Sequence, residues 1–523
     1  MFSLLNNDPI ENELPSIYAD RLGLFYTSQV NIQHKKDNGQ FFTPKPIAYL
    51  MASFCDLIQK KLRILDPGCG TAVLTCALIE YLILKNPNIE QIDLIAYETD
   101  PNLISFSTKT LTYLKHWLKN KNVQFNYILH IQDFILDNAK VLKTPNNNSD
   151  NFDIIISNPP YFKLAKDDKK SIAAKELVSG QPNIYSIFMG IAAKMLNENG
   201  ELIFITPRSF ASGNYFKAFR ELFFNTVQIN KIHLFNSRKD TFNRDSVLQE
   251  TVIIKAIKEC INPNNKVTVS SSLGIKDINE PEIKFFNSSE LIDLKSKEKI
   301  LHLPTNDKEV AVMSLVANWS NILNDFDIQV STGPVVSFRA TNFIQNYYEN
   351  TTVYLAPLYW MHNVNKMSLE WPITQKNKGQ YIRILDESKS ILLPNKNYIF
   401  LRRFSTKDDK SRLIAAPYLC DYTKAKVIGV ENKVNYIYRK NGVLETDELI
   451  GLCALLNSEL FNIYFQIFNG NVNVSATEMR EMKMPAYEEI KEIGNKIIAS
   501  NNYSMDFVNE IVNELYTLEI TQE

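Results

Sequence analysis

The sequence predicts an α/β protein, with a seven-stranded, mostly parallel sheet in the first half of the chain and a mixed α+β domain in the second. Three observations lead to this prediction. Short apolar runs alternate with longer helix-like stretches between Lys61 and Lys258, as in strands joined by crossover helices. A glycine turn directly follows the first apolar run. Beyond Glu259 the alternation stops, and 523 residues are enough for at least two domains.

The apolar runs give the expected strands. We place the domain boundary near residue 262, because a turn-rich stretch begins there. This defines a domain over 1–262, with an N-terminal segment over 1–60, and a domain over 263–523. In the second domain, apolar residues at helical spacing predict one helix over Thr446–Phe468. The predicted strands are Arg63–Asp66, Asp93–Tyr97, Phe125–His130, Phe152–Ser157, Gly200–Thr206, Lys231–Phe235 and Thr251–Ala256.

The composition, with 45% hydrophobic and 22% charged residues, is that of a globular protein and excludes collagen, coiled coils and disorder. No run approaches ~18 apolar residues, so we expect no membrane contact and a cytoplasmic location. The six scattered cysteines form no CxxC pair, which predicts reduced thiols and no metal site. The net charge of −1 hides two basic stretches, with 21 Lys and Arg against 14 Asp and Glu in 101–260, and 11 against 4 in 396–440. Basic stretches of this kind are compatible with a nucleic-acid partner.

The glycine turn Pro67-Gly68-Cys69-Gly70 follows the first strand and opens a helix, so backbone N–H groups there face a ligand. Val73 replaces the third glycine of a dinucleotide fingerprint, and Gly-Lys-Ser/Thr is absent, which disfavours a nicotinamide cofactor and ATP. Glu98 follows the second strand and is suited to accept hydrogen bonds from ribose hydroxyls. Asp133 follows the third strand and is suited to an adenine amino group. Together these residues predict a site for a nucleoside-like ligand.

The tetrapeptide Asn158-Pro159-Pro160-Tyr161 directly follows the fourth predicted strand. Its two prolines remove two backbone donors, so the turn presents acceptors, namely the Asn158 side-chain oxygen and the Pro159 carbonyl. Two fixed acceptors suit an adenine amine, because they stabilise the positive charge that develops at nitrogen as it attacks a methyl sulfonium. Tyr161 offers an aromatic face to the base. This chemistry requires no metal and no covalent nucleophile.

These motifs resemble, in the same order, those of the γ-type N6-adenine DNA methyltransferases of restriction-modification systems, the TaqI/PstI-like group. The resemblance covers about 40–260 with specific motifs, and it implies a Rossmann-like fold that binds S-adenosylmethionine. It includes Gly39-Gln40-Phe41-Phe42-Thr43-Pro44, a segment that closes over the cofactor in that family. The cofactor-binding residues that it implies are Thr43, Asp66, Gly68, Gly70, Glu98, Asp133, Phe134 and Asn158.

The same resemblance implies catalytic and DNA-contacting residues. Asn158 to Tyr161 correspond to the catalytic motif, and Tyr161 and Phe242 to two aromatic walls around an extruded base, with Phe235 as a rival to Phe242. The second domain corresponds to a DNA target-recognition domain, with resemblance over Thr332–Arg339, Asn397–Arg412 and Asn469–Ser475. Its candidate DNA-binding residues are Arg339, Arg402, Arg403, Lys407 and Arg412.

The expected function is therefore a site-specific methyltransferase that acts on N6 of a flipped-out adenine in double-stranded DNA. We expect it to be the modification component of a restriction-modification system, to act as a monomer, and to have a separate cognate restriction endonuclease, since no stretch is left for a nuclease domain. Two alternatives remain. One is a methyltransferase that uses the same tetrapeptide on RNA or on a protein glutamine. The other is a catalytically inactive DNA-binding homologue.

Overall fold

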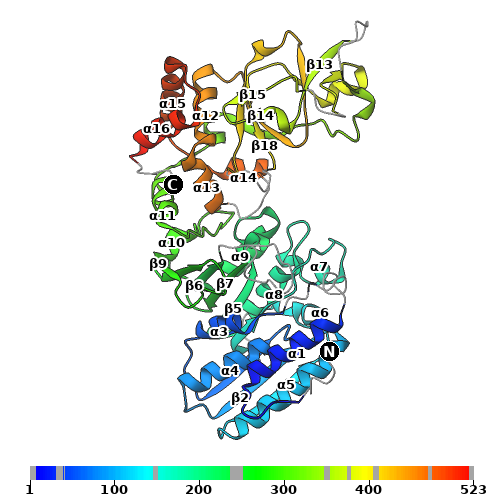
Figure 1. The fold of residues 1–523 in the computed structure, drawn as a ribbon, viewed down its shortest axis with the longest axis vertical. Helices are drawn as coiled ribbons and strands as arrows, with labels where there is room; N and C mark the ends of the chain where they lie inside the picture. The colour runs from blue at the N-terminus through cyan, green and yellow to red at the C-terminus, as the bar shows by residue number, and fades with distance from the viewer. Residues whose placement is uncertain are drawn as a thin grey trace. The chain divides into compact units, whose positions relative to one another are not determined.

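The structure, a computed structural model, describes residues 8–30, 39, 42–144, 151–235, 251–346, 354–373, 378–404, 411–468 and 474–517. The chain divides into two compact units, Met1–Thr305 and Asn306–Glu523. In Figure 1 the first unit runs from blue to green and the second from green to red. Each unit is described separately below.

A nine-stranded sheet forms the centre of the first unit, in the order β3-β2-β1-β4-β5-β7-β6-β8-β9. The first five strands in this order are parallel, whereas β7 runs antiparallel to both β5 and β6. All seven predicted strands are confirmed. The strands are β1 (Lys61–Asp66), β2 (Gln91–Tyr97), β3 (Gln124–His130), β4 (Phe152–Ser157), β5 (Leu196–Pro207), β6 (Gln228–Phe235), β7 (Thr251–Ile257), β8 (Lys266–Ser272) and β9 (Glu282–Asn287).

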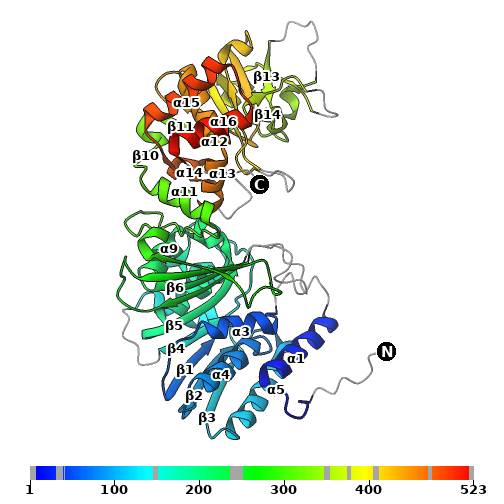
Figure 2. The ribbon, with the colours of Figure 1, turned by 60° about the vertical axis from the view of Figure 1, so that its left-hand side comes forward.

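The strand order reverses direction between β1 and β4, which creates a crevice at the carboxyl ends of the central strands. Figure 2 shows α1, α4 and α5 grouped beside β1–β3. In the centre of the sheet, β4 and the second half of β5 are nearly continuous apolar runs, as expected for strands that are buried on both faces, whereas the edge strand β3 is mostly half-buried or exposed. The helices are α1 (Pro15–Gln29), α3 (Lys45–Ser53), α4 (Val73–Lys85), α5 (Pro101–Lys119), α6 (Phe134–Asn138), α7 (Lys169–Ala173), α8 (Ile184–Lys194), α9 (Lys217–Phe224) and α10 (Ser288–Leu291).

The first unit extends beyond the boundary that we expected near 262. Strand β8 pairs in parallel with β6, and β9 pairs antiparallel with β8, so residues 263–305 continue the same sheet. A short turn, without a crossover helix, connects β7 to β8. The alternation of strands and helices therefore ends before the sheet does, and this is why the sequence pattern placed the boundary too early.

The second unit contains a four-stranded sheet, β11-β21-β18-β19, and a five-stranded sheet, β12-β16-β13-β20-β17. One apolar cluster joins the two sheets, and a second one lies mainly at the five-stranded sheet. The strands of the two sheets are β11 (Ile328–Thr332), β12 (Ile344–Gln345), β13 (Leu355–Tyr359), β16 (Tyr381–Arg383), β17 (Leu392–Pro394), β18 (Tyr398–Arg402), β19 (Ala415–Tyr418), β20 (Val427–Val430) and β21 (Val434–Arg439).

The long helix expected over Thr446–Phe468 is instead two helices, α12 (Thr446–Asn457) and α13 (Glu459–Phe468), which are bent by 60°. The break lies at Ser458, whose hydroxyl donates to Leu455 O (2.6 Å) and accepts from Phe461 N (3.2 Å). Serine competes in this way with helical backbone bonds and starts a new helix. The unit also contains α11 (Asp307–Ala317), α14 (Ala476–Glu481), α15 (Tyr487–Ser500) and α16 (Met505–Tyr516).

Within the described ranges no single helix is long and apolar enough to cross a membrane, and only the bent pair of α12 and α13 meets that criterion jointly.

Candidate active site

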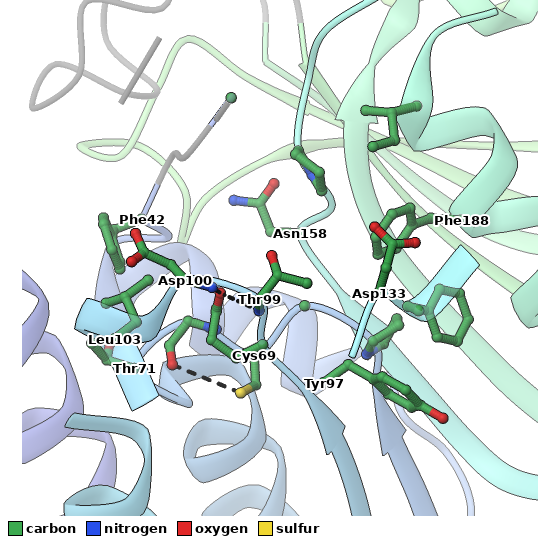
Figure 3. A pocket seen from close by; sticks show the side chains of 18 of the residues that line it. Phe42, Cys69, Thr71, Tyr97, Thr99, Asp100, Leu103, Asp133, Asn158 and Phe188 are labelled. Atoms are coloured by element: carbon green, nitrogen blue, oxygen red, sulfur yellow. Dashed lines mark hydrogen bonds between the residues drawn. The ribbon is translucent and has the colours of Figure 1, made fainter. Parts of the chain in front are cut away.

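A pocket of about 330 Å³ lies where β1, β2, β3 and β4 end. In the view of Figure 3, Asn158 lies between Phe42 and Asp100 on one side and Asp133 and Phe188 on the other. The volume is in the range of small-molecule sites, and the crevice at a strand-order reversal is where α/β sheets bind ligands. Seven of the eight predicted cofactor residues line it, namely Thr43, Gly68, Gly70, Glu98, Asp133, Phe134 and Asn158.

The glycine turn forms the floor of the pocket and depends on a left-handed backbone. Gly70 has a φ of +52°, a region that favours glycine, and it is followed by Ala72 at +65° where α4 begins. Gly70 N donates to Glu98 Oε2 (3.0 Å), and Ser107 Oγ donates to Gly70 O (2.5 Å). The turn is therefore fastened to β2 and to α5, with its backbone facing the pocket.

Asp66 is the one predicted cofactor residue that does not line the pocket. It is fully buried beneath the turn, and Thr75 Oγ1 donates to its Oδ2 (2.7 Å). Burial raises the pKa of this carboxyl to about 7, against the opposing effect of hydrogen bonds from Thr75 and from the Gly68 backbone. Asp66 thus supports the turn from below.

The buried Asp66 carboxyl predicts a pH dependence of stability. Its pKa is 3.8 when exposed and about 7 in the folded chain, so the folded state disfavours ionisation. With respect to this group, the free energy of unfolding is highest below pH ~4 and decreases by a few kcal/mol as the pH rises to ~7. Asp66→Asn should therefore reduce the drop in melting temperature between pH 5 and pH 8, as measured by calorimetry. The exposed Asp167→Asn is the control, and equal drops in all three proteins would contradict the prediction.

Glu98 lines the pocket with a carboxylate that is held by backbone amides. Its Oε2 accepts from Gly70 N (3.0 Å), and its Oε1 accepts from the amides of Thr99 and Asp100 (2.8 Å each). Burial raises the pKa of Glu98, while these amides lower it. The carboxylate is therefore fixed in direction, and its remaining lone pairs suit ligand hydroxyl groups.

Asp133 and the aromatic residues beside it form the opposite side. Asp133 caps α6, because its Oδ1 accepts from Leu136 N (3.0 Å). Phe134 is buried, with its ring centroid 5.3 Å from that of Tyr97 and 5.1 Å from that of Phe188. The arrangement therefore combines a carboxylate with aromatic rings that are inclined to one another.

Asn158 connects the tetrapeptide turn over 158–161 to the segment before α3. Its Nδ2 donates to Thr43 Oγ1 (3.0 Å), and its Oδ1 accepts from the Tyr161 hydroxyl (2.5 Å), which also lies 3.0 Å from Ile205 O. Gly39, at a φ of +56°, comes so close that a Cβ there would lie 2.9 Å from Tyr161 N. The segment therefore contacts the tetrapeptide turn directly.

The other members of the tetrapeptide are less accessible. Tyr161 is only 8% exposed, and burial raises the pKa of its hydroxyl. Pro159 is buried, and Pro160 lines the pocket. Phe242 lies outside the described residues, and its rival Phe235 is buried in the core of the sheet.

Sequence reasoning missed two charged residues of the pocket. Asp100 accepts from Tyr26 OH (2.7 Å), which ties helix α1 to the site, and Lys170 lies 2.9 Å from Asp133. Asp100 could have been found from its place before Pro101, as a helix cap two residues after Glu98. Lys170 is one of several lysines in its stretch and carries no local signal.

In the second unit, three stretches singled out by the sequence lie together. Asn432 N donates to Val335 O (2.9 Å), Arg403 N donates to Lys433 O (3.0 Å) and Val474 N donates to Arg403 O (2.8 Å). Asn435 is buried between them, accepting from Thr332 Oγ1 (3.0 Å) and donating to Val474 O (2.8 Å). Residues distant in sequence therefore form one fixed surface.

The candidate DNA-binding cations differ in their surroundings. Arg339 is exposed, and its guanidinium lies 5.4 Å from the ring centroid of Phe338, which is 76% exposed. Arg402 instead donates to Val364 O (2.6 Å) and Asn365 Oδ1 (3.1 Å), and Arg403 donates to Asn432 O (3.2 Å). Arg412 is half-buried, and Lys407 lies outside the described residues.

The strand order and the pocket define a Rossmann-like methyltransferase fold. Residues 72–242 match the Eco57I restriction-modification methylase family. The chain is 31% identical to type II methyltransferase M.PstI of Providencia stuartii over 91% of this chain and 92% of that protein. It is 32% identical to type II methyltransferase M.BsuBI of Bacillus subtilis over 89% of this chain and 91% of that protein. The DrdV–DNA complex has a TM-score of 0.48 at 13% identity, covering 92% of this chain and 59% of that chain.

The chain therefore belongs to the type II methyltransferases of restriction-modification systems, and it is a DNA methyltransferase whose cofactor is S-adenosylmethionine. The lining of the pocket fits this cofactor, because the carboxylates of Glu98 and Asp133 would accept from hydroxyl and amino groups and the rings of Phe134 and Phe188 add apolar surface. Over the described residues, no group of three or more His, Cys, Asp or Glu is placed to hold a metal ion.

Proposed function

We propose that the enzyme methylates N6 of an adenine that is flipped out of double-stranded DNA. The observation that carries this proposal is the position of Asn158, which lines the cofactor pocket and is held by Thr43 and Tyr161. A side-chain amide oxygen fixed there suits an adenine amine. The alternative functions are methylation of RNA, methylation of a protein glutamine, and DNA binding without catalysis. The test below distinguishes them.

S-adenosylmethionine supplies the methyl group as a sulfonium electrophile. The chain's own contribution is to orient the amine and to stabilise the charge that develops on it. Asn158 Oδ1 accepts one N–H of the amine, and the Pro159 carbonyl is proposed to accept the other. Acceptors fixed before the reaction need no reorganisation as the charge appears, which lowers the barrier. Thr43 keeps the amide plane of Asn158 in place.

The base is proposed to stack on Tyr161, with Phe242 on its other face. In the structure the Tyr161 hydroxyl donates to Asn158 Oδ1, the atom that is proposed to accept from the amine. The hydroxyl must therefore share or release this oxygen when the base enters. Stacking on the ring itself does not require the hydroxyl.

Tyr161→Phe and Tyr161→Ala separate the two roles of this side chain. We expect Tyr161→Phe to keep the methyl-transfer rate within about threefold of wild type, because the ring remains and Asn158 Oδ1 loses a competing donor. Tyr161→Ala should lower the rate by ~10- to 100-fold, since stacking of a base is worth ~1–3 kcal/mol. Single-turnover transfer of tritiated methyl groups to DNA measures both rates. A Phe variant as impaired as the Ala variant would contradict this role.

The second unit is proposed to read the target sequence through the exposed side chains of the cluster formed by 332–339, 402–404, 431–435 and 474, whose buried members hold it together. Arg339 is the foremost candidate there, because it is exposed beside an exposed aromatic ring. Arg402 is held by backbone and amide oxygens, so we propose that it shapes this surface. We also propose that the chain acts as a monomer and that cleavage belongs to a separate cognate endonuclease.

The test is to express the chain in cells free of adenine methylation and to sequence their DNA with detection of N6-methyladenine. We expect methylation at one short sequence, which also identifies the target. Purified protein with tritiated cofactor is then offered DNA, RNA and total protein. Label in RNA or protein but not in DNA, or no label in any of them, would overturn the proposal.

A further inference from the structure

A lysine outside the recognised motifs faces the adenine end of the cofactor pocket. Lys170 and Asp133 both line this pocket, and Lys170 Nζ lies 2.9 Å from Asp133 Oδ2. The two side chains are 27% and 22% exposed, so the pair is partly shielded from water. A negatively charged acceptor and a positively charged donor therefore lie next to each other at the site.

Both members of this pair are fixed by their local structure. Asp133 Oδ1 accepts from Leu136 N as the cap of α6, which leaves Oδ2 for Lys170. Lys170 belongs to α7, and its backbone amide donates to the capping Asp168 Oδ1 (2.8 Å). Ser171 Oγ adds a bond to Ala165 O (2.7 Å). The pair is thus held from both sides by anchored backbone.

A carboxylate oxygen has more than one lone pair, so Asp133 Oδ2 can accept from Lys170 and from a ligand N–H together. The three N–H groups of Lys170 likewise leave donors beyond the one used on Asp133. The pair thus offers an acceptor beside a donor. An adenine edge offers the complement, because its amino donor stands next to a ring nitrogen acceptor on either side.

We propose that Lys170 is a specificity-determining residue for the cofactor, which reads a ring nitrogen of adenine while Asp133 reads the adjacent amino group. This inference rests on the proposed assignment of Asp133 to the adenine of S-adenosylmethionine. It is independent of which atom in DNA receives the methyl group. A purely structural ion pair at this exposure would contribute little to stability and would not distinguish one purine from another.

The experiment measures binding of S-adenosylhomocysteine and of its 1-deaza and 7-deaza adenine analogues by calorimetry, with the full chain. In the wild type, one deaza analogue should bind ~10-fold or more weakly than S-adenosylhomocysteine, because a hydrogen bond to a charged donor is lost. The analogue that binds more weakly identifies the ring nitrogen that accepts the hydrogen bond from Lys170. Lys170→Met should lower the affinity for S-adenosylhomocysteine by a similar factor. This variant should bind S-adenosylhomocysteine and that analogue with equal affinity.

Lys169→Met is the matched control, since Lys169 is an exposed residue of the same short helix and its loss changes the charge equally. Lys169→Met should keep the wild-type affinity for S-adenosylhomocysteine and the wild-type preference for it over the deaza analogue. Lys170→Arg should retain part of both. The inference would be overturned if Lys170→Met still bound the deaza analogue more weakly than S-adenosylhomocysteine. It would also be overturned if Lys169→Met and Lys170→Met changed these affinities equally. Absence of S-adenosylhomocysteine binding by the wild type would instead overturn the assignment of the pocket, and the inference with it.

Discussion

Asn158→Ala is expected to lower methyl transfer by ~10³-fold or more while S-adenosylhomocysteine still binds. The variant removes an acceptor that acts on developing charge, and the loss of one such preorganised group costs ~10²–10³ in rate. It also removes the bond to Thr43 Oγ1, which holds the side chain in place. Single-turnover kinetics and calorimetry on the same preparation measure the two effects.

Asn225→Ala serves as the control for this experiment, because Asn225 is exposed in the same unit and its side-chain amide donates to Glu221, away from the pocket. It should leave both quantities unchanged. If Asn158→Ala kept a tenth or more of the wild-type rate, the amide oxygen could not be the acceptor that the mechanism requires.

Glu98→Ala is expected to weaken S-adenosylhomocysteine binding by ~100-fold or more. The change removes a ligand acceptor and also leaves three backbone N–H groups, those of Gly70, Thr99 and Asp100, without their carboxylate. An unsatisfied buried N–H costs ~1–3 kcal/mol, so the glycine turn should lose its present conformation. Calorimetric titration measures the affinity.

Glu90→Ala is the matched control, since the exposed Glu90 side chain pairs with Lys60 at the surface and does not line the pocket. Circular dichroism at the assay temperature establishes that each variant is folded. Binding by Glu98→Ala within threefold of the wild type would contradict the role of this carboxylate.

The sequence predicted the sheet of the first unit well, because its central parallel strands are buried on both faces and appear as short apolar runs. It predicted the pocket for a related reason. Residues that directly follow successive parallel strands, such as Gly70, Glu98, Asp133 and Asn158, must meet at one edge of the sheet. Spacing along the chain therefore translates into proximity in space.

The remaining features depend on contacts that no local pattern encodes. Lys170 reaches Asp133 from a separate helix, and the hydroxyl of Tyr161 is directed to Asn158. Arg402 stands in a run of cations and aromatic residues, yet its guanidinium is engaged by Val364 and Asn365, which are almost forty positions away in the sequence. The composition of a stretch indicates what its side chains are, whereas tertiary packing decides where they point.

The extension of the sheet through β8 and β9 determines how the chain can be cut for protein engineering. A fragment ending near 262 would strip β8 from β6 and leave a long row of unpaired backbone groups, which promotes aggregation. A cut after Thr305 retains all nine strands. Exchanges of the second unit between relatives should therefore join the parental sequences at that later position.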